Sequence, residues 1–483
     1  MASIKKNFAL SSAYQILSVI TPIITTPFLS RVIGADGNGT FAFTQSVSNY
    51  FVLFAVLGMS SYGVRTVAEC GDDRERRSRA FWNAFSMNAA VGIIVLICYA
   101  AYIVIFSDGY AFLYCIWGLW VVGSVFDVSW LLFGLEEFGI PTARNFITKI
   151  GSVLVILLFV KGPGDVWVYV LAIAGSNFAN SVLVWPFVSR YVDFVVPTKG
   201  EMIDHLKPNL ILFVPVIAIS LYSVLDKIML GAMAPIEQTG YFDYSEKISK
   251  LPMAIITALG SAVLPRMTAI ISAGKTDEGK SLVETTLWFM LVCAFALCFG
   301  IIGVAPSFCP FFFGEGFDVC VGLMSLLALV IPTVCATNVI GNQYLLPCHR
   351  DLEYTVSVAA GAAVNLFLNV LLISRFGALG AAIGSVACEA TVLVVQILLT
   401  KSDFNMRALF CPCFPYLVAG VLMSLLIRFI DLLVRPRIGA GPSLFVEFAC
   451  GAAFYGIAVF VWASNHDGQR LCAIFPSLRK KLS

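Results

Sequence analysis

The sequence predicts an all-α integral membrane protein with about 14 transmembrane helices. Of its 483 residues, 59% are hydrophobic and 12% are charged, whereas soluble proteins carry about 25% charged residues. Mean hydropathy is +0.89, and apolar stretches long enough to cross a bilayer recur along the whole chain. The formal charge of +2 provides no basic field for a polyanion. This composition excludes a soluble enzyme, a disordered scaffold and a nucleic-acid binder.

Each predicted span is an apolar stretch close to the length of about 20 residues that a bilayer requires. The first stretch runs past that length through Pro22 and Pro27 without a cleavage signature, so we expect a retained helix and not a signal peptide. In chain order the predicted spans are residues 8–29, 41–62, 84–106, 111–133, 146–160, 167–188, 210–230, 248–264, 287–309, 321–340, 354–373, 379–399, 412–433 and 444–462.

Orientation follows from the 31 Lys and Arg residues, most of which fall in the termini or in loops after even-numbered spans. The positive-inside rule then predicts an even number of spans with both termini in the cytoplasm. We expect these loop cations to act as topology anchors. On the N-terminal side they include Arg65, Arg74, Arg76, Arg77, Arg79 and Arg144.

Two short echoes indicate an internal repeat. The pattern of Gly, any residue, Phe, any residue, an aromatic, a hydroxyl and Gln or Glu occurs at residues 39–45 and again at 240–246. Residues 172–176 resemble 381–385 in the same order. The predicted organisation is therefore two six-helix bundles in parallel topology, residues 1–207 and 208–402, followed by two further helices in 403–483.

Ionisable side chains at membrane depth gather near the seventh and eighth spans and at the end of the first. Each costs about 2.5–3.5 kcal/mol to insert, so such groups are rare and face a partner or a wet cavity. Two interpretations remain open: self-neutralising pairs at four-residue spacing on the outer rim, or cations that bind an anionic substrate between the bundles while the acids balance them or carry protons. The residues are Arg31, Asp226, Lys227, Asp243, Glu246, Lys247 and Lys250.

Other polar residues carry weaker signals. Asp127 and Glu389 are lone acids in apolar spans, and the absence of a local partner favours a function. Asn365 and Asn369 are four apart and share one helix face. The three histidines fall at predicted cytoplasmic rims, which excludes an imidazole-based metal site in the membrane and leaves catalysis poorly supported. Cys309 and Cys320 flank a predicted outer loop and could form a disulfide.

Four stretches together carry a family resemblance. They are LGMSSYGVR at 57–65, GLEEF at 134–138 followed by Arg144 and Asn145, GYFDYSEKI at 240–248, and LPRM at 264–267. In these stretches and in its span pattern, the chain resembles over essentially its whole length the polysaccharide flippases of the MOP exporter superfamily, the Wzx-like O-antigen and teichoic-acid transporters.

The resemblance implies a MATE-like, V-shaped pair of six-helix lobes in the bacterial plasma membrane. Such proteins move undecaprenyl-diphosphate-linked oligosaccharide from the inner to the outer leaflet by alternating access. The implied partners are this lipid-linked glycan, membrane lipids, and a polysaccharide polymerase and glycosyltransferases. No cofactor is implied beyond H⁺ or Na⁺ as a coupling ion. The expected head-group residues are Arg31, Lys227, Lys247 and Lys250, and the expected coupling residues are Asp127, Asp226, Glu246 and Glu389.

Several alternatives share parts of this pattern. A multidrug exporter or a lipid II flippase would have the same architecture, and the stretches after the second and fourth spans favour neither. A membrane-embedded glycan polymerase or acyltransferase would be expected to carry a long outer loop with catalytic Arg or His, which the sequence lacks. A non-transporting scaffold would not need the charges near the seventh and eighth spans.

Overall fold

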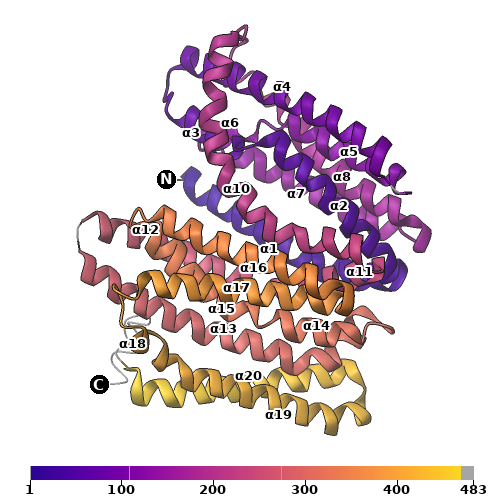
Figure 1. Ribbon diagram of the computed structural model, residues 1–483, viewed down its shortest axis with the longest axis vertical. Coiled ribbons are helices and arrows are strands. Elements are labelled where there is room, and N and C mark those ends of the chain that lie inside the picture. The colour runs from indigo at the N-terminus through magenta and orange to yellow at the C-terminus, as the bar shows by residue number, and fades with distance from the viewer. Residues whose placement is uncertain (1, 108, 274, 469–483) are drawn as a thin grey trace. The chain divides into compact units, whose positions relative to one another are not determined.

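Helices make up the regular structure of the described residues, 2–107, 109–273 and 275–468 of a computed structural model. Figure 1 shows the helices in chain order from indigo to yellow. They form two units, Met1–Gly240 and Tyr241–Ser483. The all-α prediction is confirmed. The predicted boundaries near residues 207 and 402 stay a prediction.

The first unit is built around aromatic and aliphatic side chains. Phe41 stacks on Tyr169 with ring centroids 3.8 Å apart, and Phe81 packs against Trp130 in a second cluster. Its helices are α1 (Ala2–Val32), α2 (Gly34–Val56), α3 (Met59–Ala68), α4 (Arg74–Phe106), α5 (Ala111–Val125), α6 (Ser129–Gly134), α7 (Gly139–Phe159), η1 (Pro163–Asp165), α8 (Val166–Val182), α9 (Trp185–Val188) and α10 (Lys199–Met233).

The second unit has its core along α13, against which α19 and α20 pack. Its helices are α12 (Met253–Ser272), α13 (Thr276–Phe313), α14 (Val319–Leu327), α15 (Val330–Thr337), η2 (Asn338–Leu345), α16 (Asp351–Phe376), α17 (Ala378–Thr400), α18 (Met406–Phe410), η3 (Cys411–Cys413), α19 (Phe414–Ile438) and α20 (Ala440–His466). Helix α11 (Ile236–Lys250) begins in the first unit and ends in the second.

One helix of the second unit changes its winding. Residues 338–345 form the π-helix η2, directly after α15. The N–H of Leu346 donates to the carbonyl of Gly341, five residues earlier, at 3.1 Å. Such a wide turn accommodates one extra residue within an otherwise α-helical segment, and π-turns are frequent at functional sites.

Twelve segments among the described residues are long and apolar enough to cross a membrane. Each overlaps one predicted span. The two other predicted spans, 210–230 and 248–264, fall on α10 and on the α11–α12 region, so the count of fourteen stays a prediction. The span at 248–264 is not one continuous helix, because α11 ends at Lys250 and α12 begins at Met253 after the N-cap Pro252. A proline at a helix start costs little, since the first N–H groups have no intrahelical partner.

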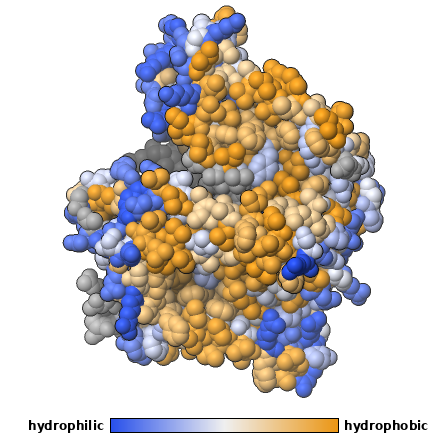
Figure 2. Space-filling view, viewed as in Figure 1, coloured by the Kyte–Doolittle hydropathy of each residue, from blue (hydrophilic) through white to orange (hydrophobic). Residues whose placement is uncertain are grey.

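Large apolar side chains remain exposed along the outer faces of the helices. On α4, Ile94 is 62% exposed and Val104 is 84% exposed. Figure 2 shows hydrophobic residues covering large continuous areas of the visible surface. Because water-soluble proteins rarely expose apolar patches of that extent, these faces are suited to contact with lipid.

The repeat detected in the sequence marks a close helix crossing in the first unit. Gly39 begins the first copy and Gly240 begins the second. A Cβ on Gly39 would lie 2.0 Å from the carbonyl oxygen of Ile236, and a Cβ on Gly240 would lie 1.8 Å from that of Ala35. The Asn38 side chain donates to the Gly240 carbonyl at 3.3 Å. The start of α2 and the start of α11 therefore touch backbone to backbone, which only glycine allows.

Candidate functional site

Two ion pairs lie along α11, the helix on which the sequence placed most of the intramembrane charge. Lys247 Nζ lies 2.5 Å from Asp243 Oδ2, and Lys250 Nζ lies 2.6 Å from Glu246 Oε1. The side chain of Asp243 is 0% exposed and that of Lys247 is 28% exposed, whereas that of Lys250 is 50% exposed. The predicted four-residue pairing is confirmed, in the acid-before-base order that suits a helix. The roles predicted for Lys247, Lys250 and Glu246 stay predictions.

Glu389 has a charged neighbour. It lies on α17, where Lys250 of α11 and Tyr354 of α16 interact with it electrostatically. The sequence predicted no local partner for Glu389, and this charged neighbour comes from another helix and not from the adjacent turns. The structure brings two predicted coupling acids, Glu246 and Glu389, to the same predicted head-group cation, Lys250.

The predicted site residues of the first unit are spread over two helices. Arg31 is exposed in the last turn of α1, and its Nη1 donates to the Pro27 carbonyl at 2.8 Å. On α10, Asp226 is buried and Lys227 is half-buried. The charge of Asp226 acts on the hydroxyl of Tyr50, which in turn donates to the Ser220 carbonyl at 3.2 Å. The functions predicted for Arg31, Asp226 and Lys227 stay predictions.

Asp127 lies within the apolar segment 111–134, at the break between α5 and α6 and not in a continuous helix. Its carboxylate accepts from the N–H of Ser129 at 3.0 Å and from the Ser129 hydroxyl. The same hydroxyl accepts from Arg144 Nη2 at 3.1 Å, and Arg144 interacts electrostatically with Asp127. The sequence predicted no local partner that neutralises Asp127, and the cation that faces it comes from another helix, α7. The carboxylate accepts a hydrogen bond from a backbone N–H group at the start of α6 that has no partner within the helix, and acidic side chains are stabilising at this position.

Arg144 is the polar residue that sequence reasoning misplaced. We expected a cytoplasmic topology anchor, but its side chain is buried in α7. Its Nη1 donates to the Asn180 carbonyl at 2.5 Å, and the Asn180 side chain accepts from Thr148 at 2.8 Å. A buried charge needs a full set of hydrogen-bond partners. The family-like stretch that includes Arg144 and Asn145 was the signal that could have found it.

A second buried acidic group was absent from the predicted sites. The Ser307 hydroxyl on α13 contacts a carboxyl oxygen of Asp431 on α19 and lies 2.9 Å from Glu447 Oε1 on α20. Arg435 Nη1 lies 4.0 Å from the other oxygen of Asp431. A serine hydroxyl has one hydrogen to donate. It can therefore donate to only one of the two carboxyl groups at a time.

Amide and thiol side chains in the second unit lie in different surroundings. Asn369 Nδ2 donates to Asn365 Oδ1 at 3.2 Å, which confirms that both share one face of α16. Cys309 and Cys320 are free thiols. Cys309 Sγ lies 3.5 Å from Met324 Sδ, and Cys320 Sγ lies 3.8 Å from the Tyr241 carbonyl. The disulfide considered from the sequence is therefore not formed.

Comparison with known proteins assigns the family. Residues 4–271, more than half of the chain, match the family described as "Polysaccharide biosynthesis protein". The chain belongs to this family. The predicted membership in a polysaccharide flippase-like group is confirmed at this level, and the matched segment contains all four stretches on which the resemblance rested.

Two relatives of known description match most of the chain. The chain is 21% identical over 405 residues to the "Putative O-antigen transporter" of Escherichia coli (strain K12), covering 83% of this chain and 97% of the relative. It is 23% identical over 482 residues to the "Probable flippase AglR" of Haloferax volcanii, covering 96% and 97%.

The fold matches those of two kinds of transporter. A structure titled "Lipid II flippase MurJ, inward closed conformation" aligns with a TM-score of 0.73 and 13% identity, over 95% of this chain and 99% of that one. An inward-facing multidrug resistance MATE family transporter of the MOP superfamily aligns with a TM-score of 0.64 and 12% identity, over 81% and 94%. The predicted MATE-like fold is confirmed.

Proposed function

We propose that the protein is a flippase that moves undecaprenyl-diphosphate-linked oligosaccharide from the inner to the outer leaflet of the bacterial plasma membrane by alternating access. The family and the names of its relatives support the transport of a lipid-linked glycan. The observation that carries the proposal is the charged face of α11, in which two acid–base pairs occupy a helix whose neighbouring side chains are mostly buried. A diphosphate head group needs cations, and ionisable groups buried within a membrane protein are rare and mostly functional.

The arrangement around Lys250 supports a link between ion binding and head-group binding. Lys250 contacts Glu246 at 2.6 Å and faces Glu389. A proton or Na⁺ on either carboxylate would weaken its hold on the ammonium group and release that group for a phosphate. The proposed head-group cations are Arg31, Lys227, Lys247 and Lys250, and the proposed coupling acids are Asp127, Asp226, Glu246 and Glu389. H⁺ or Na⁺ would be the coupling ion, with no other cofactor.

Complementation tests the proposal. The chain is expressed in strains that lack their O-antigen flippase, their lipid II flippase or their multidrug exporter, and lipid-linked precursor is scored by leaflet. In the strain without its O-antigen flippase we expect the glycan lipid to reach the outer leaflet. We expect no rescue of the strains that lack a lipid II flippase or a multidrug exporter. If the lipid-linked precursor accumulates in the inner leaflet of the first strain although the protein is correctly inserted, the proposal is overturned. Rescue of the second or third strain would instead assign lipid II or a small-molecule drug as the substrate.

Matched variants connect the transport to the site. Lys250→Gln removes the cation between Glu246 and Glu389, whereas Lys275→Gln removes an exposed cation that pairs with Glu278 at 3.1 Å outside the apolar spans. We expect transport to fall at least tenfold in the first variant and to persist in the second. Both termini are proposed to lie in the cytoplasm. Glycosyltransferases would supply the glycan lipid at the inner leaflet, and a polysaccharide polymerase would receive it at the outer leaflet.

A further inference from the structure

A polar pocket of about 560 Å³ opens in the first unit where the end of α3, the start of α4 and the start of α10 meet. Tyr62, Arg65, Glu69, Arg76 and His205 line its polar side, and Ile211 contributes to its apolar side. Its volume lies in the range of small-molecule sites. None of the residues predicted to bind the head group or the coupling ion belongs to it.

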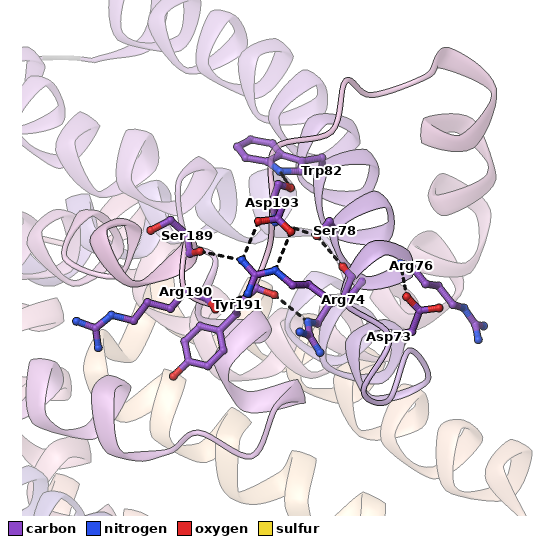
Figure 3. A network of polar contacts seen from close by, with 10 residues as sticks. Asp73, Arg74, Arg76, Ser78, Trp82, Ser189, Arg190, Tyr191 and Asp193 are labelled. Carbon is purple, nitrogen blue, oxygen red and sulfur yellow. Dashed lines mark hydrogen bonds and ion pairs between the residues drawn. The ribbon is translucent and has the colours of Figure 1, made fainter.

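The four arginines in the first turns of α4 divide into two groups. Arg74 donates twice to the Asp193 carboxylate at 2.7 Å, and Arg77 donates to the Tyr191 carbonyl at 3.1 Å. In Figure 3 these contacts fasten the segment 189–193 to the start of α4, while the guanidinium of Arg76 extends away from them. Arg79 is held by Glu201 at 3.0 Å. These three arginines therefore have structural partners, and Arg76 stays available to the pocket.

The pocket offers a donor set that suits a phosphate. Arg65 uses Nε to contact Glu69 at 3.1 Å, and within the described residues neither of its terminal nitrogens makes a hydrogen bond. Arg76 donates its backbone N–H to Asp73, and its guanidinium makes no hydrogen bond with any residue that the structure describes. Guanidinium groups bind phosphate oxygens in pairs of parallel hydrogen bonds. The Tyr62 hydroxyl lies 2.5 Å from His205 Nδ1, which fixes both rings at the pocket wall.

An apolar groove of about 370 Å³ adjoins this pocket along α10. Ile211 lines both, and the groove continues over Ile203, Leu210 and Val214. These three side chains are exposed, as is Ile211. Residues 203–214 span roughly 16 Å of helix at 1.5 Å per residue. A cationic pocket joined to an apolar groove of this length matches an amphiphile with an anionic head and a hydrocarbon chain.

We propose that the pocket and the groove together form a docking site for the polyprenyl diphosphate of the lipid-linked substrate. The diphosphate contacts Arg65 and Arg76, and the first isoprene units lie along Ile211, Leu210 and Val214. This inference rests on the proposed function for the identity of the lipid. The site lies on the first unit and shares no residue with the charged pairs of α11, so variants of the two can be tested independently.

Binding of defined lipids to the purified full chain tests the site. Native mass spectrometry measures the affinity for undecaprenyl diphosphate, inorganic diphosphate and phosphatidylglycerol. In the Arg65→Gln/Arg76→Gln double variant we expect the affinity for undecaprenyl diphosphate to fall at least tenfold, because two charge-assisted contacts are lost. Leu210→Asn/Val214→Asn is expected to lower the affinity for undecaprenyl diphosphate and to leave that for inorganic diphosphate unchanged.

Two controls keep the result specific. Arg375→Gln removes an exposed arginine from the last turn of α16, and Leu352→Asn replaces an apolar side chain that is 76% exposed. Both are expected to bind as the wild type does. Equal affinities in the double variant and the Arg375→Gln control would overturn the site. A parallel, equal loss of phosphatidylglycerol binding would overturn the substrate assignment in favour of a general anionic-lipid site.

The same experiment separates this inference from the proposed function. If the protein binds undecaprenyl diphosphate through Arg65 and Arg76 but fails to rescue the flippase-deficient strain, the docking site is supported and the proposed transport is overturned. If the wild-type protein rescues the strain and the double variant binds the lipid as tightly as the wild type, the proposed transport is supported and the docking site is overturned.

Discussion

Gly39 and Gly240 meet at one helix crossing, where each lies against the backbone of the other's helix. A side chain on Gly39 would reach the Ile236 carbonyl, and one on Gly240 would reach the Ala35 carbonyl. Both glycines start the repeated sequence pattern at 39–45 and 240–246. The glycine of each repeat copy is therefore needed for the same reason: at this crossing neither helix has room for a side chain.

Alanine at either glycine is expected to destabilise the protein. The added methyl group would contact a carbonyl oxygen, which no side-chain rotation can move away, so we expect Gly39→Ala and Gly240→Ala each to cost about 3 kcal/mol. Thermal unfolding in detergent measures the loss. Gly175→Ala serves as the control, because a Cβ there meets nothing within 4 Å. An unchanged midpoint in Gly240→Ala would contradict the close crossing.

The buried arginine of α7 is expected to be structural. Arg144→Gln removes the cation that faces Asp127 and leaves the Ser129 hydroxyl and the Asn180 carbonyl without their donor. Breaking a buried charge network costs about 3–5 kcal/mol. We expect a correspondingly lower unfolding midpoint, and the exposed Arg375→Gln should match the wild type. Full stability of Arg144→Gln would show that the network is not needed.

The two ion pairs of α11 are expected to differ in strength. Lys247→Gln breaks the ion pair with the buried Asp243 carboxylate, so a loss of about 3 kcal/mol is expected. Lys250 is half-exposed, and such pairs contribute about 1 kcal/mol or less. Urea or thermal unfolding of both variants compares them. The double variant Asp243→Asn/Lys247→Gln should recover most of the loss, and a failure to recover would mean that the two charges act separately.

A pH-dependent stability is expected from His205. Burial lowers the pKa of His205 below its usual 6.5, against the opposing charges of Asp204 and Glu201, and Arg65, Glu69 and Arg76 also line its pocket. The folded state therefore binds fewer protons than the unfolded state, so stability falls as the pH drops below about 6.5. Comparing midpoints between pH 5 and pH 8 should show a smaller dependence in His205→Gln. An identical pH profile would assign the effect to other groups.

The carboxyl pair at Ser307 predicts an unusual tolerance. If one carboxyl holds a proton, Glu447→Gln keeps both the shape and a donor, so a change within about 1 kcal/mol is expected. Glu447→Ala leaves a cavity and removes one partner of Ser307, so a loss of about 2 kcal/mol or more is expected. Thermal unfolding of the two variants decides between them. A strongly destabilised Glu447→Gln would show that the ionised carboxylate is required.

Features with a local cause could be predicted from the sequence. The twelve apolar segments follow from hydropathy. The Asp243–Lys247 and Glu246–Lys250 pairs follow from a spacing of four residues on one helix. The Asn365–Asn369 contact has the same origin. In each case the partners are neighbours along the helix surface, so the periodicity of the chain determines that they meet.

Features that join distant segments could not be predicted. Asp127 meets Arg144 only because the helix breaks between α5 and α6, and hydropathy does not report such a break inside an apolar run. Lys250 of α11 and Glu389 of α17 interact although 138 residues lie between them in the sequence. The pocket around Tyr62 and His205 joins residues that hydropathy assigns to different parts of the chain. Loop arginines looked alike in the sequence, and only their partners distinguish Arg74 from Arg76.

The wide turn of η2 sets the rotational phase of the residues that come after it in the chain. One residue fewer in 338–345 would restore ordinary α-helical winding and turn the end of this helix, with the short connection to α16 at residues 346–350, by roughly 100° about the helix axis. Arg350, whose Nη2 donates to the Leu399 carbonyl of α17 at 3.0 Å, would then miss that acceptor. A single-codon deletion in this segment would therefore be far more damaging than most substitutions there, and the length of η2 carries as much information as its composition.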